Sequence, residues 1–220
     1  RAPVGATGRG AQHAQNMERY FIGVPGLKVV AVSNAYDAKG VLKAAVRDDD
    51  PVLMFEHKLL YGSKGARAET GTVDGSSDIP DEDYVVPLGT ANVLRPGTHV
   101  TILAWLLMAH EALNAAQILA GQGIEAEVVD VRSLAPIDWK TIGDSVAKTG
   151  VAIIVEEGAK TGGVGAELAA GLMENCGGSL TAPVVRVASA DVPVPFAPVL
   201  ENAYRPDAAR IVKAVQMLLG

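Results

Sequence analysis

The chain has 220 residues, of which 49% are hydrophobic and 20% charged, and its formal net charge is −6. That charge argues against a nucleic-acid backbone as partner, which needs a basic surface, and no apolar run approaches the ~18 residues that span a membrane. The single cysteine, Cys176, cannot form an internal disulfide, which favours a reducing compartment. No signal-peptide pattern is found, and the start at Arg1 predicts an internal position of a longer protein.

The first segment is rich in glycine and leads to a histidine. Residues 5–15 read "GATGRGAQHAQ", and residues 14–21, "AQNMERYF", predict a helix directly after His13. A lone histidine near a helix start is most often a cap, a core residue or a surface residue. Glycines let the backbone come close to a ligand or another chain, and loops on a rigid scaffold often carry functional groups. His13 is therefore the first catalytic candidate.

A β-α-β unit follows. Residues 27–33 and 52–56 are short apolar runs that predict strands, and residues 35–47 predict a helix with Asn34 as N-cap. This order favours a parallel sheet. Residues 62–83 then break the pattern with glycines and mixed charge, which indicates a linker between domains rather than a long surface loop within one domain.

After the linker, strands and helices alternate again. Strands are predicted over residues 99–105, 126–133, 151–157 and 183–189. Helices are predicted over residues 107–122, from Asp138 as cap to about 148, from about 165 to 175, and from about 207 to 219. The alternation predicts a doubly wound α/β domain of about 130 residues, in which the working surface lies at the carboxyl ends of the strands.

Other polar residues are weaker candidates. His57 ends a predicted strand and is best interpreted as a packed or interface histidine, while His99 and His110 are interpreted as structural or surface residues. Cys176 has no histidine pattern nearby and is expected to be buried at a helix end.

Three further segments each allow two interpretations. Residues 156–168, "EEGAKTGGVGAEL", could cradle a phosphate, but they lack the Walker and dinucleotide spacings, so tight strand-to-helix packing is favoured. Residues 47–50, "RDDD", are either a solvated turn or oxygen ligands for a hard cation. Residues 190–204 carry Val194, Phe196 and Val199, which predict a contact patch.

Several motifs, in order, carry a family resemblance. They are "RAPVG…AQHAQ", "GLKVV…YDAKGVLKAAVRDDDPVLMFEHKLLYGSKG", "EDYVVPLGTANVLRPGTHVTIL", "AEVVDVRSLAPID", "VEEGAKTGGVGAEL" and "APVVRVASADVPVPFAP". Together they resemble the β subunit of the thiamine-diphosphate-dependent decarboxylating component of 2-oxo acid dehydrogenase complexes. The match covers almost the whole chain apart from residues 65–80. The members of closest resemblance act on pyruvate, and the acetoin and branched-chain relatives are the alternatives.

The resemblance implies a domain plan. Residues 1–70 would be the C-terminal part of a domain that binds the pyrimidine half of the cofactor, residues 71–83 a linker, and residues 84–220 a transketolase C-terminal-like domain. The glutamate that activates the cofactor would lie before Arg1, so no cofactor-binding residue is assigned in this chain. Thiamine diphosphate and magnesium would be held mainly by a separate α subunit in an α2β2 assembly, which works with a lipoyl-bearing acyltransferase core.

The resemblance also implies site residues. His13 in "AQHAQ" falls on the family's active-site histidine in "AQHSQ", with Ala14 in place of serine. An imidazole titrating near neutrality could give the proton that opening of the lipoyl disulfide needs. A potassium ion is implied at Ala45, Asp48 and Asp50, where the family's "AIRDNNP" is "AVRDDDP".

Two alternatives remain open at this point. The chain could instead belong to an acetoin or branched-chain 2-oxo acid dehydrogenase, or it could be a non-catalytic subunit that docks the acyltransferase core. The expected compartment is the cytoplasm, or the mitochondrial matrix or plastid stroma in a eukaryote.

Overall fold

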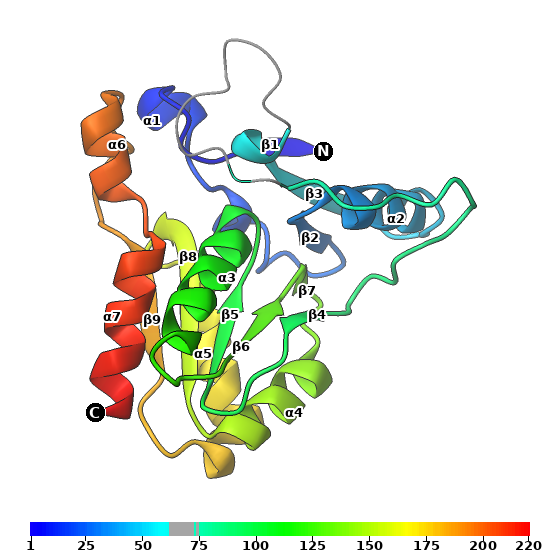
Figure 1. Cartoon of the computed structure of the whole chain (residues 1–220). Helices are drawn as coiled ribbons and strands as arrows, with labels where there is room; N and C mark the ends of the chain where they lie inside the picture. The colour runs from blue at the N-terminus through cyan, green and yellow to red at the C-terminus, as the bar shows by residue number, and fades with distance from the viewer. Residues whose placement is uncertain (62–72, 74) are drawn as a thin grey trace.

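The computed structural model describes residues 1–61, 73 and 75–220. Its first half builds a four-stranded sheet in which β1, β3 and β2 are parallel and β7 is antiparallel to β2 (Figure 1). The strands, in order across the sheet, are β1 (Ala2–Val4), β3 (Val52–His57), β2 (Lys28–Val32) and β7 (Ser133–Ala135). Since β7 belongs to the second half of the chain, the two halves share one sheet.

The second half builds a five-stranded sheet that is parallel except for the edge strand β4. Its strands, in order, are β4 (Asn92–Arg95), β6 (Ala126–Asp130), β5 (Val100–Ala104), β8 (Ala152–Ala159) and β9 (Val185–Ser189). Strands separated by helices therefore give the doubly wound arrangement that the sequence predicts.

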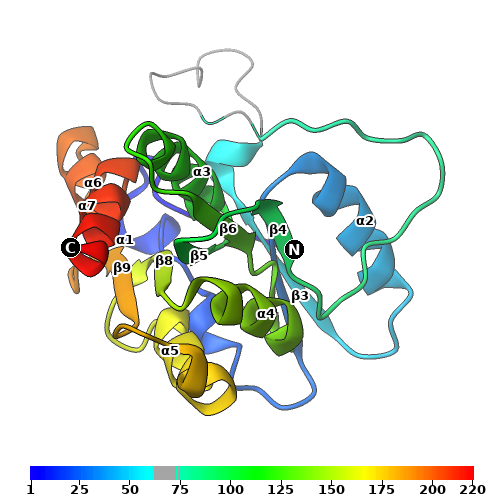
Figure 2. The same cartoon turned by 60° about the horizontal axis from the view of Figure 1, so that its bottom comes forward.

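Helices cover both faces of this second sheet (Figure 2). Two of them, α3 and α7, pack against each other on one face, and α4 and α5 lie on the other. Their bounds are α3 (Leu107–Ala120), α4 (Trp139–Thr149), α5 (Val164–Cys176) and α7 (Ala208–Leu219). The core on the α4 and α5 side also contains Val29 and Phe55 from the first sheet, so burial joins the two halves into one hydrophobic core.

Most predicted elements are confirmed. Helix α2 (Ala35–Val46) begins at Asn34, whose side chain accepts a hydrogen bond from the backbone N–H of Asp37. Asp138 caps α4 in the same way through Thr141, and Cys176 is buried at the end of α5, as expected. The helix α6 (Pro198–Tyr204) and the short strands β1, β4 and β7 are elements that the sequence analysis missed.

One predicted element is wrong, and one predicted strand extends too far. The predicted helix over residues 14–21 is replaced by a turn and a short 3₁₀ helix, η1 (Glu18–Tyr20), because the helical segment α1 (Gly10–His13) ends at His13. The predicted strand over residues 126–133 breaks after β6, since Arg132 takes a positive φ of 56° and sends β7 into the other sheet.

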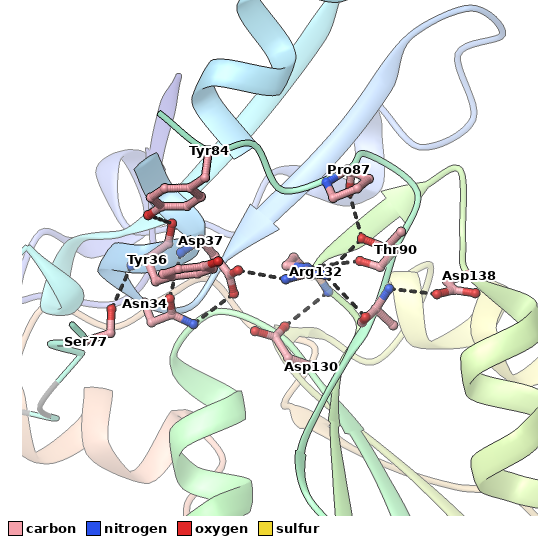
Figure 3. Close-up of polar contacts among 11 residues, drawn as sticks. Asn34, Tyr36, Asp37, Ser77, Tyr84, Pro87, Thr90, Asp130, Arg132 and Asp138 are labelled. Carbon is pink, nitrogen blue, oxygen red and sulfur yellow. Dashed lines mark hydrogen bonds and ion pairs between the residues drawn. The ribbon is translucent and has the colours of Figure 1, made fainter. Parts of the chain in front are cut away.

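Arg132 joins the two halves at this break (Figure 3). Its guanidinium forms a 2.7 Å ion pair with Asp37 of α2, and both side chains are almost fully buried. The same guanidinium donates to the carbonyls of Thr90 and Ala91 and to the Thr90 hydroxyl. The backbone N–H of Arg132 donates to Asp130, so one residue links β6, α2 and the segment before β4.

The described part of the predicted linker runs along α2. Tyr84 stacks on Tyr36 with ring centroids 4.5 Å apart (Figure 3), and Asp83 forms ion pairs with Lys43 and Arg47. Residues 62–72 and 74 of that linker lie outside the described residues. The domain boundary at residues 83 and 84 stays a prediction.

Candidate active site

The glycine-rich loop between β1 and α1 has a conformation that requires glycine. Gly5, Gly8 and Gly10 have φ values of 96°, 68° and 66°, a region that residues with a side chain rarely adopt. A Cβ atom on Gly5 would also lie 1.9 Å from Nε2 of His57. The three glycines are therefore a structural requirement of the path that leads to His13.

Two buried carboxylates of the second half hold this loop by its backbone. The N–H of Ala6 donates to Oε1 of Glu157 at 2.7 Å. The N–H of Gly8 donates to both carboxylate oxygens of Glu201, at 2.7 and 2.9 Å. Hydrogen bonds to a charged acceptor are among the stronger ones in proteins. The glycine-rich loop, whose backbone has high conformational freedom, is thus hydrogen-bonded to β8 and to α6.

Glu157 is itself oriented by His57. Its Oε2 lies 2.8 Å from Nε2 of His57, and the exposed fractions of the two side chains are 3% and 0%. The backbone N–H of Leu59 donates to Nδ1 of His57, so the ring proton is on Nε2 and is donated to Glu157. Burial alone would raise the pKa of Glu157, but the interactions with His57 and Ala6 outweigh burial and lower the pKa. His57 is therefore a packed histidine, as the sequence analysis favours.

His13 lies at the end of α1 and is exposed. Its backbone carbonyl accepts a hydrogen bond from Nζ of Lys58, the residue after His57. Burial lowers the pKa of this lysine. The imidazole of His13 makes no hydrogen bond to any residue that the structure describes. The backbone at His13 is thus held in place while its ring is free to meet a reactant.

The other two histidine interpretations are confirmed. His99 is exposed, and its ring accepts a hydrogen bond from the backbone N–H of Glu125. The ring of His110 contacts the carbonyl oxygen of Ser33 at 2.6 Å, which joins α3 to the end of β2. Both are structural contacts away from the glycine-rich loop.

The second glycine-rich loop, at residues 156–168, is filled by a carboxyl group of its own strand. The backbone N–H of Gly165 donates to Glu156 at 3.2 Å. A Cβ on Gly163 or Gly165 would lie 2.5 Å from a Glu156 oxygen. The N-terminus of α5 therefore already holds a carboxyl group, and the geometry favours tight strand-to-helix packing over a phosphate site.

Burial raises the pKa of Glu156 from 4.5 to about 7. The native state therefore binds this proton more tightly than the unfolded state, and stability is lost as the pH rises from about 4.5 to about 7. We expect Glu156→Gln, which keeps an oxygen for Gly165, to remove that loss. The variant should be more stable than the parent at pH 8 by on the order of 3 kcal/mol.

Urea unfolding of both proteins between pH 4.5 and 8 measures this difference. Glu167→Gln, an exposed change in the first turn of the same helix, is the matched control and should keep the parent pH dependence. Equal pH profiles for Glu156→Gln and the parent protein would contradict the buried-carboxyl argument.

The predicted cation ligands face a lysine. Nζ of Lys28 lies 2.7 Å from both carboxylate oxygens of Asp48 and 3.1 Å from Asp50. The ion pair with Asp48 raises the pKa of Lys28 and lowers that of Asp48. The carbonyl of Ala45 accepts from the backbone N–H of Asp48. Within residues 1–61, 73 and 75–220, no group of three or more His, Cys, Asp or Glu side chains is arranged to hold a metal ion.

The predicted contact patch needs one correction. Val194 is 5% exposed and packs with Ala6, Ala14 and Tyr204, because the glycine-rich loop covers it. Phe196 and Val199 are exposed, as predicted, together with Leu200. The exposed apolar surface is therefore formed by α6 and the residues just before it.

A groove of about 630 Å³ lies beside α1, between the segment after His13 and the turns that follow β8 and β9. Gln15, Asn16 and Arg19 line one side, and Thr161 and Asp191 line the other. No helix among the described residues is long and apolar enough to cross a membrane. Ala11 and Gln15 line this groove and His13 does not, so the candidate active site consists of the glycine-rich loop and His13, and the groove lies beside it.

Two domain families match the chain. Residues 1–64 match the transketolase pyrimidine binding domain, and residues 89–211 match the transketolase C-terminal domain. A structure described as a split-gene transketolase, inactive β4 tetramer, is similar with a TM-score of 0.76 and 29% identity, over 98% of this chain and 64% of that chain. A transketolase mutant from Pichia stipitis has a TM-score of 0.65 at 13% identity, over 99% of this chain and 29% of that one, which shows the fold alone.

Curated relatives are more similar in sequence. Pyruvate dehydrogenase E1 component subunit beta-2, chloroplastic, of Arabidopsis thaliana is 46% identical over 97% of this chain and 50% of its own length. Acetoin:2,6-dichlorophenolindophenol oxidoreductase subunit beta of Cupriavidus necator is 42% identical over 98% of this chain and 61% of its own length. The chain thus spans about half the length of the plant relative. The chain belongs to the transketolase C-terminal domain family and is a homologue of the β subunits of pyruvate dehydrogenase E1.

Proposed function

We propose that this chain is part of the β subunit of a thiamine-diphosphate-dependent pyruvate dehydrogenase of the acyl-transferring type. The whole protein would decarboxylate pyruvate oxidatively and pass the acetyl group to a lipoyl group, as an α2β2 assembly with a lipoyl-bearing acyltransferase core. The observation that supports this most is the exposed His13 ring on a backbone held by Glu157, Glu201 and Lys58.

The role of His13 in this proposal is proton transfer. When the carbon that has lost the carboxyl group uses its electron pair to bond to one sulfur of the lipoyl dithiolane, the S–S bond breaks and the second sulfur leaves as a thiolate. The imidazolium of His13 donates its proton to that sulfur, which gives the thiol. An imidazole side chain suits this step, because its ring nitrogen can hold a proton and release it.

The glycine-rich loop at residues 156–168 does not suit the diphosphate of the cofactor. The helix N-terminus at α5 is already occupied by the Glu156 carboxyl, which accepts the backbone N–H of Gly165. We therefore propose that the α subunit holds the diphosphate and magnesium, and we assign no cofactor contact here. Thiamine diphosphate would supply stabilisation of negative charge at the reacting carbonyl carbon, and this chain would supply the proton and the orientation.

The test is substrate use by the whole α and β pair. With thiamine diphosphate present, the reconstituted pair should reduce an artificial electron acceptor faster with pyruvate than with 2-oxoisovalerate or acetoin as substrate. Preference for acetoin would favour the alternative that the Cupriavidus necator relative supports, since its name states acetoin oxidation. No turnover of any of the three would favour a non-catalytic subunit that docks the acyltransferase core.

We also propose, from the family resemblance, that Ala45, Asp48 and Asp50 contribute to a potassium site, in competition with the Lys28 ammonium. Lys28→Met should then make thermal unfolding more dependent on potassium, because the carboxylates lose their internal cation and a ligand bound only by the folded state stabilises it. A concentration one hundred times the Kd would contribute about 2.7 kcal/mol.

The measurement is the melting temperature of the complex in potassium and in tetramethylammonium chloride at equal ionic strength. The potassium effect should be larger for Lys28→Met than for the parent. Lys140→Met, which removes an exposed ion pair with Asp144, is the control for a lost lysine. Identical melting in both salts for both proteins would leave residues 47–50 as a turn paired with Lys28.

A further inference from the structure

We propose that Glu157 and Glu201 are positioning residues for His13, an inference that rests on the proposed function of this histidine. Neither carboxylate touches the His13 ring. Each instead accepts a backbone N–H of the loop that leads to it, from Ala6 and from Gly8.

Geometry and burial carry this inference. Glu157 and Glu201 are 3% and 7% exposed, so both carboxylates lie out of water, where their hydrogen bonds are strong and leaving them unmade is costly. They come from β8 and α6, more than 150 residues further along the chain than Ala6 and Gly8. The loop is thus anchored to the second half of the molecule, whereas His13 belongs to the first.

The far end of the loop, at His13, is held by Lys58 of the first half, next to the partner of Glu157. His57 donates to Glu157, and the next residue, Lys58, donates to the carbonyl of His13. The dipeptide His57-Lys58 therefore connects the carboxylate that holds the start of the loop to the backbone at its end. Loss of one anchor should let the His13 ring move by an ångström or more, and misplacement of about 1 Å can lower a rate ~100-fold.

Glu201 offers the simpler test, since among the described residues its carboxylate accepts a hydrogen bond from Gly8 alone, and it is not part of the His57 pair. We expect Glu201→Ala in the full-length α and β complex to lower acyl transfer to the lipoyl group about 10- to 100-fold. Decarboxylation with an artificial electron acceptor should fall much less. Glu201→Gln keeps an oxygen acceptor for Gly8 and should restore most of the transfer rate.

Two further measurements separate positioning from folding. Hydrogen exchange of the peptide that covers residues 5–13 should be faster in Glu201→Ala than in Glu201→Gln. Glu111→Ala is the matched control, because it also removes a carboxylate that accepts one backbone N–H, that of Ala208 at the start of α7. This control should leave the ratio of the two activities unchanged.

Equal losses in both activities for Glu201→Ala, in proportion to a lower melting temperature as in Glu111→Ala, would overturn the inference. So would unchanged transfer in Glu201→Ala while His13→Ala abolishes transfer. If His13→Ala itself spares transfer, the proposed function fails. In that case, faster hydrogen exchange of residues 5–13 in Glu201→Ala than in Glu201→Gln would still support the anchoring of the loop, and equal exchange would contradict it.

Discussion

His13→Ala should lower acyl transfer by ~100- to 10,000-fold, the usual contribution of a positioned general acid to its step. The lipoyl thiolate would then leave without a nearby proton donor. Decarboxylation measured with an artificial electron acceptor needs no lipoyl group and should fall much less. The two assays are complex-coupled NADH production and reduction of the artificial acceptor by the α and β pair.

The structure indicates that the two assays can be compared in His13→Ala without a large loss of folded protein. The His13 ring is exposed and has no hydrogen-bond partner among the described residues, so its loss should change stability little. His99→Ala is the control, because His99 is also exposed but precedes β5 at the amino end of the second sheet. Equal losses in both assays for His13→Ala, with a lower melting temperature, would mean that His13 has a structural role only.

Arg132→Met should destabilise the protein by about 3–5 kcal/mol, the cost of removing one partner of a buried ion pair. Among the described residues, the change leaves the buried Asp37 carboxylate with the Asn34 amide as its one side-chain partner, and it loses the bonds to Thr90 and Ala91 (Figure 3). Urea unfolding at constant pH gives the change in the free energy of unfolding.

The double variant Asp37→Asn with Arg132→Met tests the same ion pair by removing both of its charges. The double variant has no unpaired buried charge at this point and should recover part of the loss, so the two changes are not additive. Lys140→Met, whose ion pair with Asp144 is exposed, should cost less than about 1 kcal/mol. A loss for Arg132→Met as small as that of Lys140→Met would contradict the role of Arg132 in joining the two halves.

The sequence by itself determines the local structure of most of this chain. Apolar β-branched runs predict β2, β3, β5 and β8, because each is buried over most of its length. The caps Asn34 and Asp138 predict where α2 and α4 begin, since a cap needs only residues next to it in the chain. The motif around His13 and its resemblance to a known family indicate the candidate catalytic residue.

Only the tertiary structure decides how these pieces meet. No local signal tells that the Arg132 backbone ends one strand and sends the next into the other sheet, because its positive φ is compensated by contacts with Asp37, Thr90 and Ala91, which are distant in sequence. The same holds for the predicted helix after His13. Helix propensity there is overridden by Glu18, whose carboxylate lies buried against the Trp105 ring nitrogen.

The candidate site likewise depends partly on the local sequence and partly on the tertiary structure. Three glycines before a histidine predict a loop that can approach another group, but they do not tell what holds it. Glu157 and Glu201 do so from positions more than 150 residues away from the loop residues that they contact. The local sequences "VEEG" and "VLEN" do not distinguish these carboxylates from exposed ones, because only folding buries them. A buried carboxylate then needs a hydrogen-bond donor that is buried beside it. Which backbone N–H groups lie there depends on the tertiary structure and not on the local sequence.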